Sequence, residues 1–257
     1  MGRWHFDDTT VTTTQPSSRG ILTGVGIGPG DPDLITVKAL KQLQASPVVA
    51  FPAGRQGQPG VAERIIAPWL RSHQLQLPLW FPYVFDPATL SAAWQTAAQQ
   101  VWQYLQAGQD VTFASEGDVS FYSTFSYLAQ ALIQQYPTAQ VRAIPGVCSP
   151  LAAAAVMGQP LTQQHQRLAI LPAVYAISEL ETALDWAEVV VLMKLGSVYA
   201  EVWQVLAQRQ LLQQSYVVQS ATTADQIVYA GLGDLPTLSL PYFSILVTQV
   251  KPLDLVF

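Results

Sequence analysis

The stretch Gly20 to Asp33, GILTGVGIGPGDPD, decides the fold of the first half of the chain. Its apolar opening predicts a short buried strand, and the glycines and prolines that follow predict a tight turn. Apolar residues then recur at helical spacing, so an amphipathic helix is expected from Pro32. A glycine-rich turn before a helix lets backbone N–H groups approach an anionic ligand closely, although an ordinary strand-to-helix connection has the same pattern.

The composition narrows the class of protein. Half of the 257 residues are hydrophobic, 11% are charged and the formal net charge is -5, which argues against nonspecific nucleic-acid binding. The single cysteine excludes an internal disulfide, and three scattered histidines suggest no metal site. Neither a membrane-spanning run nor a signal peptide is visible, so a cytoplasmic protein without a membrane partner is expected.

The order of strand and helix patterns divides the chain into three parts. Residues 1–19 are polar and lack a period, which predicts a flexible arm or a start codon placed too early. Strands and helices alternate over 20–157, as in an α/β domain with a mostly parallel sheet. Residues 158–257 form a second α/β domain, whose last three strands follow one another without a helix and predict a mixed sheet.

Three glycine-containing turns each follow a strand of the first half: GPGD at 28–31, EGD at 116–118 and PGV at 145–147. The carboxyl ends of parallel strands share one sheet edge, so the turns should meet there and form a ligand cleft. Pro29 or Asp31 occupies the place of the third glycine of a dinucleotide fingerprint. A mononucleotide-type ligand held by backbone contacts therefore fits better than a dinucleotide or ATP.

These segments resemble a known family in order along the chain. GVGIGPGDPDLITVKAL resembles the opening signature of the tetrapyrrole (corrin and porphyrin) methylases, and EGDVSFY and IPGVCS resemble that family's central loop and following turn. VVLMK at 190–194 and QSATTADQIV at 219–228 are similar to its two later segments. FPYVFD and the YSTF extension within 81–128 resemble the subgroup that methylates C20 of precorrin-2 or cobalt-factor II.

The resemblance implies a two-domain α/β tetrapyrrole methylase fold and a role in cobalamin (vitamin B12) biosynthesis. It implies S-adenosylmethionine as methyl donor, bound between the domains, with the tetrapyrrole in a trough over the first. It further implies a homodimer without a protein-bound metal. The alternatives are a relative that methylates another position or substrate, and a non-catalytic ligand-binding protein.

The resemblance also implies site residues, carried over by position. The implied cofactor contacts are Pro29, Glu116, Gly117, Asp118, Phe121, Ser123, Thr124, Cys148, Ser149, Met193 and Ala221. Asp118 suits a bond to the methionine ammonium, and Phe121 and Met193 suit a flat adenine. Asp31, Tyr122, Tyr127 or water could remove the proton that the methyl group displaces.

Several of these residues also have purely structural interpretations. Met193 could be core, Cys148 could simply start a helix, and Asp31 could begin the first helix beside Pro32. Glu116 is expected to be a surface carboxylate unless the cofactor covers it.

The sequence departs from the family pattern at two places. Val119 stands where many members have proline, and Gln219-Ser220 replaces the usual Glu-Arg, which weakens the assignment of Ala221. Because the implied substrate carries many carboxylates, we expect cations to be concentrated at the trough. These are Arg19, Lys38, Arg55, Arg64 and Lys194.

Overall fold

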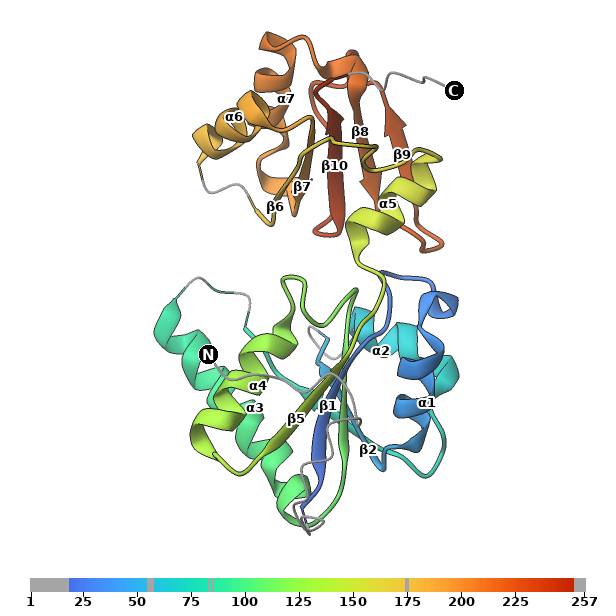
Figure 1. The fold of residues 1–257 in the computed structure, drawn as a ribbon, viewed down its shortest axis with the longest axis vertical. Helices are drawn as coiled ribbons and strands as arrows, with labels where there is room; N and C mark the ends of the chain where they lie inside the picture. The colour runs from blue at the N-terminus through green and yellow to red at the C-terminus, as the bar shows by residue number, and fades with distance from the viewer. Residues whose placement is uncertain (1–18, 55–57, 83, 85, 174–175, 252–257) are drawn as a thin grey trace. The chain divides into compact units, whose positions relative to one another are not determined.

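The computed structural model describes residues 19–54, 58–82, 84, 86–173 and 176–251, which form two compact units divided between Cys148 and Ser149 (Figure 1). Residues 1–18 of the predicted arm and Arg55 lie outside the described residues. The predicted boundary fell after Met157, at the far end of helix α5 (Ser149–Met157). The division precedes α5 because Ala153 and its neighbours pack into a core cluster made by strands of the second unit.

The first unit contains a five-stranded parallel sheet, as predicted. Its strand order is β3-β2-β4-β1-β5, so β1 lies between two partners near one side of the sheet. The strands are β1 (Ile21–Gly26), β2 (Val48–Pro52), β3 (Leu75–Leu79), β4 (Val111–Ser115) and β5 (Gln140–Ile144). Since both faces of this sheet are covered, β1 and β4 are buried almost along their whole length.

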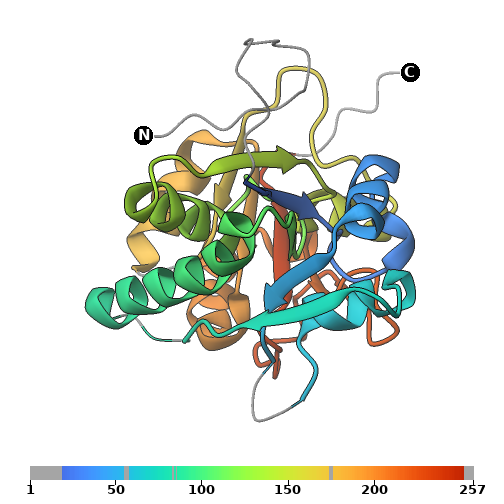
Figure 2. The same cartoon turned by 90° about the horizontal axis from the view of Figure 1, so that it is seen from below.

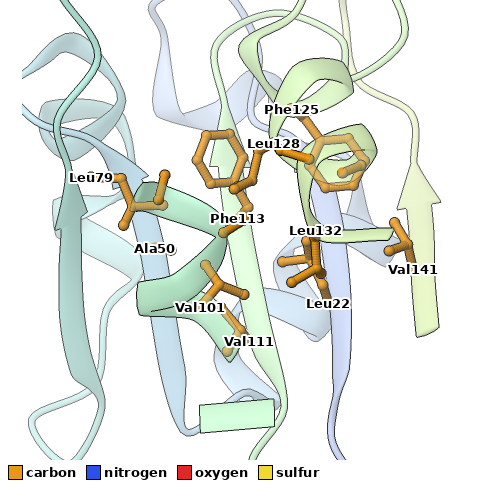
Figure 3. Close-up of a cluster of buried hydrophobic side chains, with 14 of the residues drawn as sticks. Leu22, Ala50, Leu79, Val101, Val111, Phe113, Phe125, Leu128, Leu132 and Val141 are labelled. Atoms are coloured by element: carbon orange, nitrogen blue, oxygen red, sulfur yellow. The ribbon is translucent and has the colours of Figure 1, made fainter. Parts of the chain in front are cut away.

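Helices cover both faces of the first sheet (Figure 2). On one face lie α1 (Val37–Ala45) and α2 (Val61–Ile66), and on the other α3 (Pro87–Gln106) and α4 (Thr124–Gln135). The core under α3 and α4 contains the fully buried rings of Phe113 and Phe125 (Figure 3). A second core, under α1 and α2, contains Phe51.

The first helix begins later than predicted. Pro32–Leu34 form only a 3-10 turn, and Ile35 is extended with φ -68° and ψ 134°. Ile35 buries its side chain in the core, and the Thr36 hydroxyl then caps α1 by accepting the Ala39 N–H at 3.2 Å. The apolar residues before Val37 therefore belong to the turn that leads into the helix.

The second unit contains a mixed sheet, as predicted, and its strand order is β6-β7-β10-β8-β9. Strand β6 pairs parallel with β7, whereas β10 pairs antiparallel with β7 and β8, and β9 antiparallel with β8. The strands are β6 (Leu168–Leu171), β7 (Val189–Met193), β8 (Ser215–Gln219), β9 (Ile227–Ala230) and β10 (Ser244–Gln249).

Helices also cover both faces of the second sheet. Successive side chains of β7 alternate between the two cores: Val190 packs with α6 (Ile177–Trp186) and α7 (Tyr199–Gln208), and Val191 with α5. This double burial explains why β7 is an uninterrupted apolar run. Over the described ranges, no helix combines the length and the apolar character needed to cross a membrane.

Candidate functional site

The GPGD and EGD turns meet at the carboxyl edge of the first sheet, as predicted. Gly28 and Gly117 form an antiparallel bridge, in which the Gly117 N–H donates to the Gly28 carbonyl at 2.8 Å and the reverse bond is 3.3 Å long. Both residues have left-handed backbones, with φ of +81° and +68°, a conformation that favours glycine. The bridge joins the strand ends of β1 and β4.

The PGV turn joins the same edge by close backbone packing. A Cβ added to Gly26 would lie 2.5 Å from the Gly146 nitrogen, and one added to Gly146 would lie 2.3 Å from the Gly117 carbonyl oxygen. The Thr36 hydroxyl that caps α1 also donates to the Pro145 carbonyl at 3.4 Å. These glycines are therefore explained by contact between the turns, and no phosphate fingerprint is needed.

Asp118 ties the central loop to the PGV turn. Its Oδ2 accepts the Gly146 N–H at 2.7 Å, and its Oδ1 accepts the Ser120 N–H at 2.8 Å and the Ser120 hydroxyl at 2.6 Å. The side chain is buried. Neither the role of Ser120 nor the bond to Gly146 could be predicted from the sequence, because both depend on where the turns meet.

Glu116 ties the central loop to helix α2. Its Oε1 accepts the Ala62 N–H at 3.1 Å, in the first turn of that helix. Burial raises the pKa of Glu116, and the Ala62 N–H and the charge of Arg64 oppose this effect in part. Glu116 is therefore not the exposed surface carboxylate that was expected, because it is half-buried and anchored to the first turn of α2.

Ser123 and Thr124 open helix α4. The Ser123 hydroxyl is buried, pairs with the Ser115 hydroxyl at 2.7 Å and caps the helix by accepting the Phe125 N–H at 3.0 Å. Thr124 follows as the first helical residue and is half-buried. The Ser123 side chain thus has structural partners of its own.

Aromatic rings flank the central loop. Half-buried Phe121 lies edge-on to Tyr122, with 4.7 Å between ring centroids, and Tyr122 has a left-handed backbone with φ +51°. Tyr127 instead stacks on Trp94 of α3, with centroids 5.1 Å apart and an interplanar angle of 22°. The two candidate tyrosines therefore have different ring partners.

The remaining first-unit residues occupy turns. Asp31 Oδ1 accepts the Asp33 N–H at 2.9 Å, so Asp31 caps the 3-10 turn at Pro32, in line with its structural interpretation. Pro29 is half-buried within the same turn. Cys148 has a half-buried free thiol and directly precedes α5, as a helix-start residue would.

In the second unit, Ser149 opens α5, Met193 is the last residue of β7, and Ala221 follows β8. Met193 is half-buried and pairs with Ile245 at the start of β10. Ala221 is buried just beyond β8, whose Val218 pairs with the other side of Ile245. One strand therefore separates Met193 from Val218, a distance of about 10 Å, and Ala221 lies three residues beyond Val218.

Strained backbone residues accompany these positions. Among the described residues, six non-glycine residues have positive φ, and four of them flank predicted contacts. These are Tyr122 beside Phe121, Lys194 beside Met193, and Ser220 and Thr222 on either side of Ala221. Such conformations cost about 1–3 kcal/mol each and are concentrated at functional sites in proteins.

The cation prediction is wrong for Arg19. This residue precedes β1, and its guanidinium lies 5.8 Å from the Trp102 ring centroid, at the sheet edge opposite the turns. Arg64 donates to the Pro59 carbonyl at 2.8 Å, and exposed Lys38 lies in the first turn of α1. Lys194 belongs to the second unit, where its Nζ lies 5.5 Å from the Tyr242 ring centroid.

Comparison with known proteins gives the same family as the sequence motifs. The family model for the Tetrapyrrole (Corrin/Porphyrin) Methylases matches residues 21–236. The chain is 32% identical to the precorrin-2 C(20)-methyltransferase of a Sinorhizobium species and 31% identical to the cobalt-precorrin-2 C(20)-methyltransferase of Salmonella typhimurium, covering 88% of this chain and 94% of each relative.

Another relative is longer. The cobalamin biosynthesis protein CobIJ of Mycobacterium tuberculosis is 35% identical over 89% of this chain, which spans only 46% of that protein. Among solved structures, the cobalt precorrin-4 methyltransferase CbiF has a TM-score of 0.67 at 20% identity, covering 90% of this chain and 96% of its own. The uroporphyrin-III C-methyltransferase of Thermus thermophilus, complexed with S-adenosyl homocysteine, has a TM-score of 0.66 at 20% identity, with 90% and 98% covered.

Proposed function

The chain belongs to the tetrapyrrole (corrin/porphyrin) methylase family, and we propose that it transfers a methyl group from S-adenosylmethionine to C20 of precorrin-2 or of cobalt-factor II, in cobalamin biosynthesis. The observation that carries the proposal is the match to two C20-methyltransferases over 94% of their length. The fold is shared with a methyltransferase that has been solved with S-adenosyl homocysteine, which supports the choice of donor.

Residues in the turns of the first unit, and others in the second unit, suit this donor. The main chain at Gly28 and Gly117 presents no side chain that would keep a ligand away, while half-buried Phe121 and Met193 offer apolar surface for an adenine ring. Pro29, Thr124, Cys148, Ser149 and Ala221 complete the proposed set. When bound, S-adenosylmethionine supplies an electrophilic methyl group on a sulfonium.

The rest of the proposed mechanism concerns what the chain itself does. Its turns hold the substrate carbon in line with the donor and exclude water, which accounts for much of the catalysis of such a transfer. A new carbon–carbon bond forms as the carbon–sulfur bond breaks, and the substituted carbon then loses a proton. Among Asp31, Tyr122 and Tyr127 we favour Tyr122 as a proton relay, whose oxygen accepts the displaced proton as its own hydroxyl proton passes to water, because it is exposed and lies at the strained end of the central loop.

A methyl-transfer assay tests the proposal. Purified protein is incubated with S-adenosylmethionine and either precorrin-2 or cobalt-factor II, and the product is followed by mass and absorbance. We expect a gain of one methyl group with one of the two substrates, and the comparison reveals whether the substrate carries cobalt. A protein that binds the donor but adds no methyl group to either substrate would instead be a non-catalytic relative.

One further alternative function remains part of this test. A family member that acts at another ring position would add a methyl group elsewhere on the macrocycle, so the position must be determined as well as the mass.

We also propose a homodimer, on the family resemblance. Sedimentation equilibrium should give twice the 28.0 kDa chain mass, and a monomer would reject this part of the proposal.

A further inference from the structure

Three consecutive residues of the central loop each bond to a different neighbouring segment. Glu116 accepts the Ala62 N–H at the start of α2, Gly117 forms the bridge with Gly28, and Asp118 accepts the Gly146 N–H. The loop that follows β4 is thus the common partner of the segments that follow β2, β1 and β5.

The strand order explains how one loop can reach all three. Strand β4 lies between β2 and β1, and β5 lies beyond β1. Glu116 therefore bonds toward the β2 side, while Gly117 and Asp118 bond toward the β1 and β5 side. The left-handed φ of +68° at Gly117 turns the chain between the two carboxylates, which lets them serve opposite sides.

The carboxylate of Asp118 is largely occupied by these internal bonds. An ionised carboxylate accepts about four hydrogen bonds, and Asp118 already accepts three, from Gly146 and from the N–H and hydroxyl of Ser120. Because the side chain is also buried, little of it is available to a ligand ammonium. Its bonds instead determine where the PGV turn lies.

We propose that Glu116 and Asp118 are positioning residues, which hold the α2 start and the PGV turn in place for the methyl donor without contacting the donor. This inference rests on the proposed function. It replaces the bond between Asp118 and the methionine ammonium that the family resemblance implied. Donor contact on this loop is left to the main chain of Gly117 and to Phe121.

Two ligands distinguish positioning from direct contact. S-adenosylhomocysteine carries the amino-acid group, whereas 5′-methylthioadenosine lacks it, and both affinities are measured by calorimetry. In Asp118→Asn, an amide NH2 must face either Gly146 N–H or the Ser120 donors, so we expect both affinities to fall by the same factor, about tenfold. A loss confined to S-adenosylhomocysteine would show an ammonium contact and overturn the inference.

The matched control is Asp110→Asn. Asp110 Oδ1 accepts the Ile21 N–H at 2.8 Å, a bond of the same kind at the opposite edge of the same sheet. We expect this variant to bind both ligands like the wild type. Hydrogen exchange without ligand should accelerate at the Gly146 amide in Asp118→Asn only, and unchanged exchange there would also overturn the inference.

Glu116 is tested by rescue with a neutral acceptor. Glu116→Gln keeps an oxygen for the Ala62 N–H and should bind both ligands nearly as the wild type does, whereas Glu116→Ala should weaken both. Equal losses in the two variants, confined to S-adenosylhomocysteine, would show a charge contact with the ligand. Wild-type protein that binds neither ligand would reject the proposed function, and this failure is distinct because it needs no variant.

Discussion

Gly28 and Gly117, at the ends of two neighbouring parallel strands, are joined by an antiparallel backbone bridge. Because both have left-handed backbones, a side chain at either position would be strained. The edge where the three turns meet is therefore built from main chain. We propose that this is the surface on which the methyl donor lies.

Gly26→Ala should disrupt the contact between the turns. The added methyl group would lie 2.5 Å from the Gly146 nitrogen and 2.7 Å from the Gly117 oxygen, both of them backbone atoms. We expect a loss of about 1–3 kcal/mol in the free energy of unfolding, together with weaker S-adenosylhomocysteine binding. Urea denaturation and calorimetry measure the two effects.

Gly158→Ala is the control for this substitution. A Cβ there has nothing within 4 Å, although φ is +67°, so only backbone strain is added. We expect a loss of about 1–2 kcal/mol in stability and unchanged ligand binding. If Gly26→Ala also bound ligand normally, the packing of the turns would not determine the donor site.

Ser123→Ala should destabilise the first unit. The substitution removes the cap of α4 and leaves the buried Ser115 hydroxyl without this partner. We expect a loss of about 2 kcal/mol in urea denaturation. Asp86→Ala removes only an exposed cap from α3, whose Thr89 N–H it accepts at 2.8 Å, and should cost less, about 1 kcal/mol. Equal losses would show that the Ser115 contact contributes nothing.

Tyr127 and Tyr122 should respond differently to loss of the hydroxyl. The ring of Tyr127 stacks on Trp94, and phenylalanine preserves that contact, so Tyr127→Phe should keep the wild-type kcat. Tyr122→Phe should lower kcat by a factor of about 100 if its oxygen accepts the displaced proton. Steady-state methyl transfer measures both, and the reverse pattern would assign the proton transfer to Tyr127.

The Glu188 cluster should make stability depend on acid pH. Glu188 accepts hydrogen bonds from Arg167 and Lys251, at 2.7 and 2.9 Å from its Oε1, and these bonds hold its pKa below the ordinary value of 4.5. Because the folded-state pKa is lowered, the stabilisation is present above pH 4.5 and is lost as the pH falls below it.

Glu188→Gln should therefore lower Tm at neutral pH, and its difference from the wild type should shrink below pH 4.5. The control is Asp185→Asn, which removes an ion pair to Arg209 from a carboxylate whose side chain is 65% exposed. That variant should change Tm little at any pH. A Glu188→Gln difference that stayed constant with pH would contradict the role given to these ion pairs.

Much of this fold could be predicted from the sequence because its strands are strongly apolar. The LAIL and VVVLM segments are strands at the predicted residues, and the parallel order of the first half follows from alternating strands and helices. The predicted start of α1 is wrong because the spacing of Ile35 matches a helical period, although its backbone is extended in a turn before the helix. Local periodicity does not distinguish these two placements.

The site could be predicted only in outline. The convergence of three glycine turns follows from parallel strands, but the partners of Asp118 and Glu116 depend on strand order, which the sequence does not specify. The strained backbones at Lys194, Ser220 and Thr222 gave no sequence signal, because none is glycine. The prediction for Arg19 was wrong because it considered charge alone, whereas the position of Arg19 before β1 puts it at the sheet edge opposite the turns.

The most direct test of the central claim is the position of the transferred methyl group. The protein is incubated with S-adenosylmethionine carrying a ¹³C-labelled methyl group and with precorrin-2 or cobalt-factor II, and the product is examined by carbon NMR. We predict a single labelled methyl group at C20. A label at another ring carbon, or no label in the macrocycle, would contradict the proposed function.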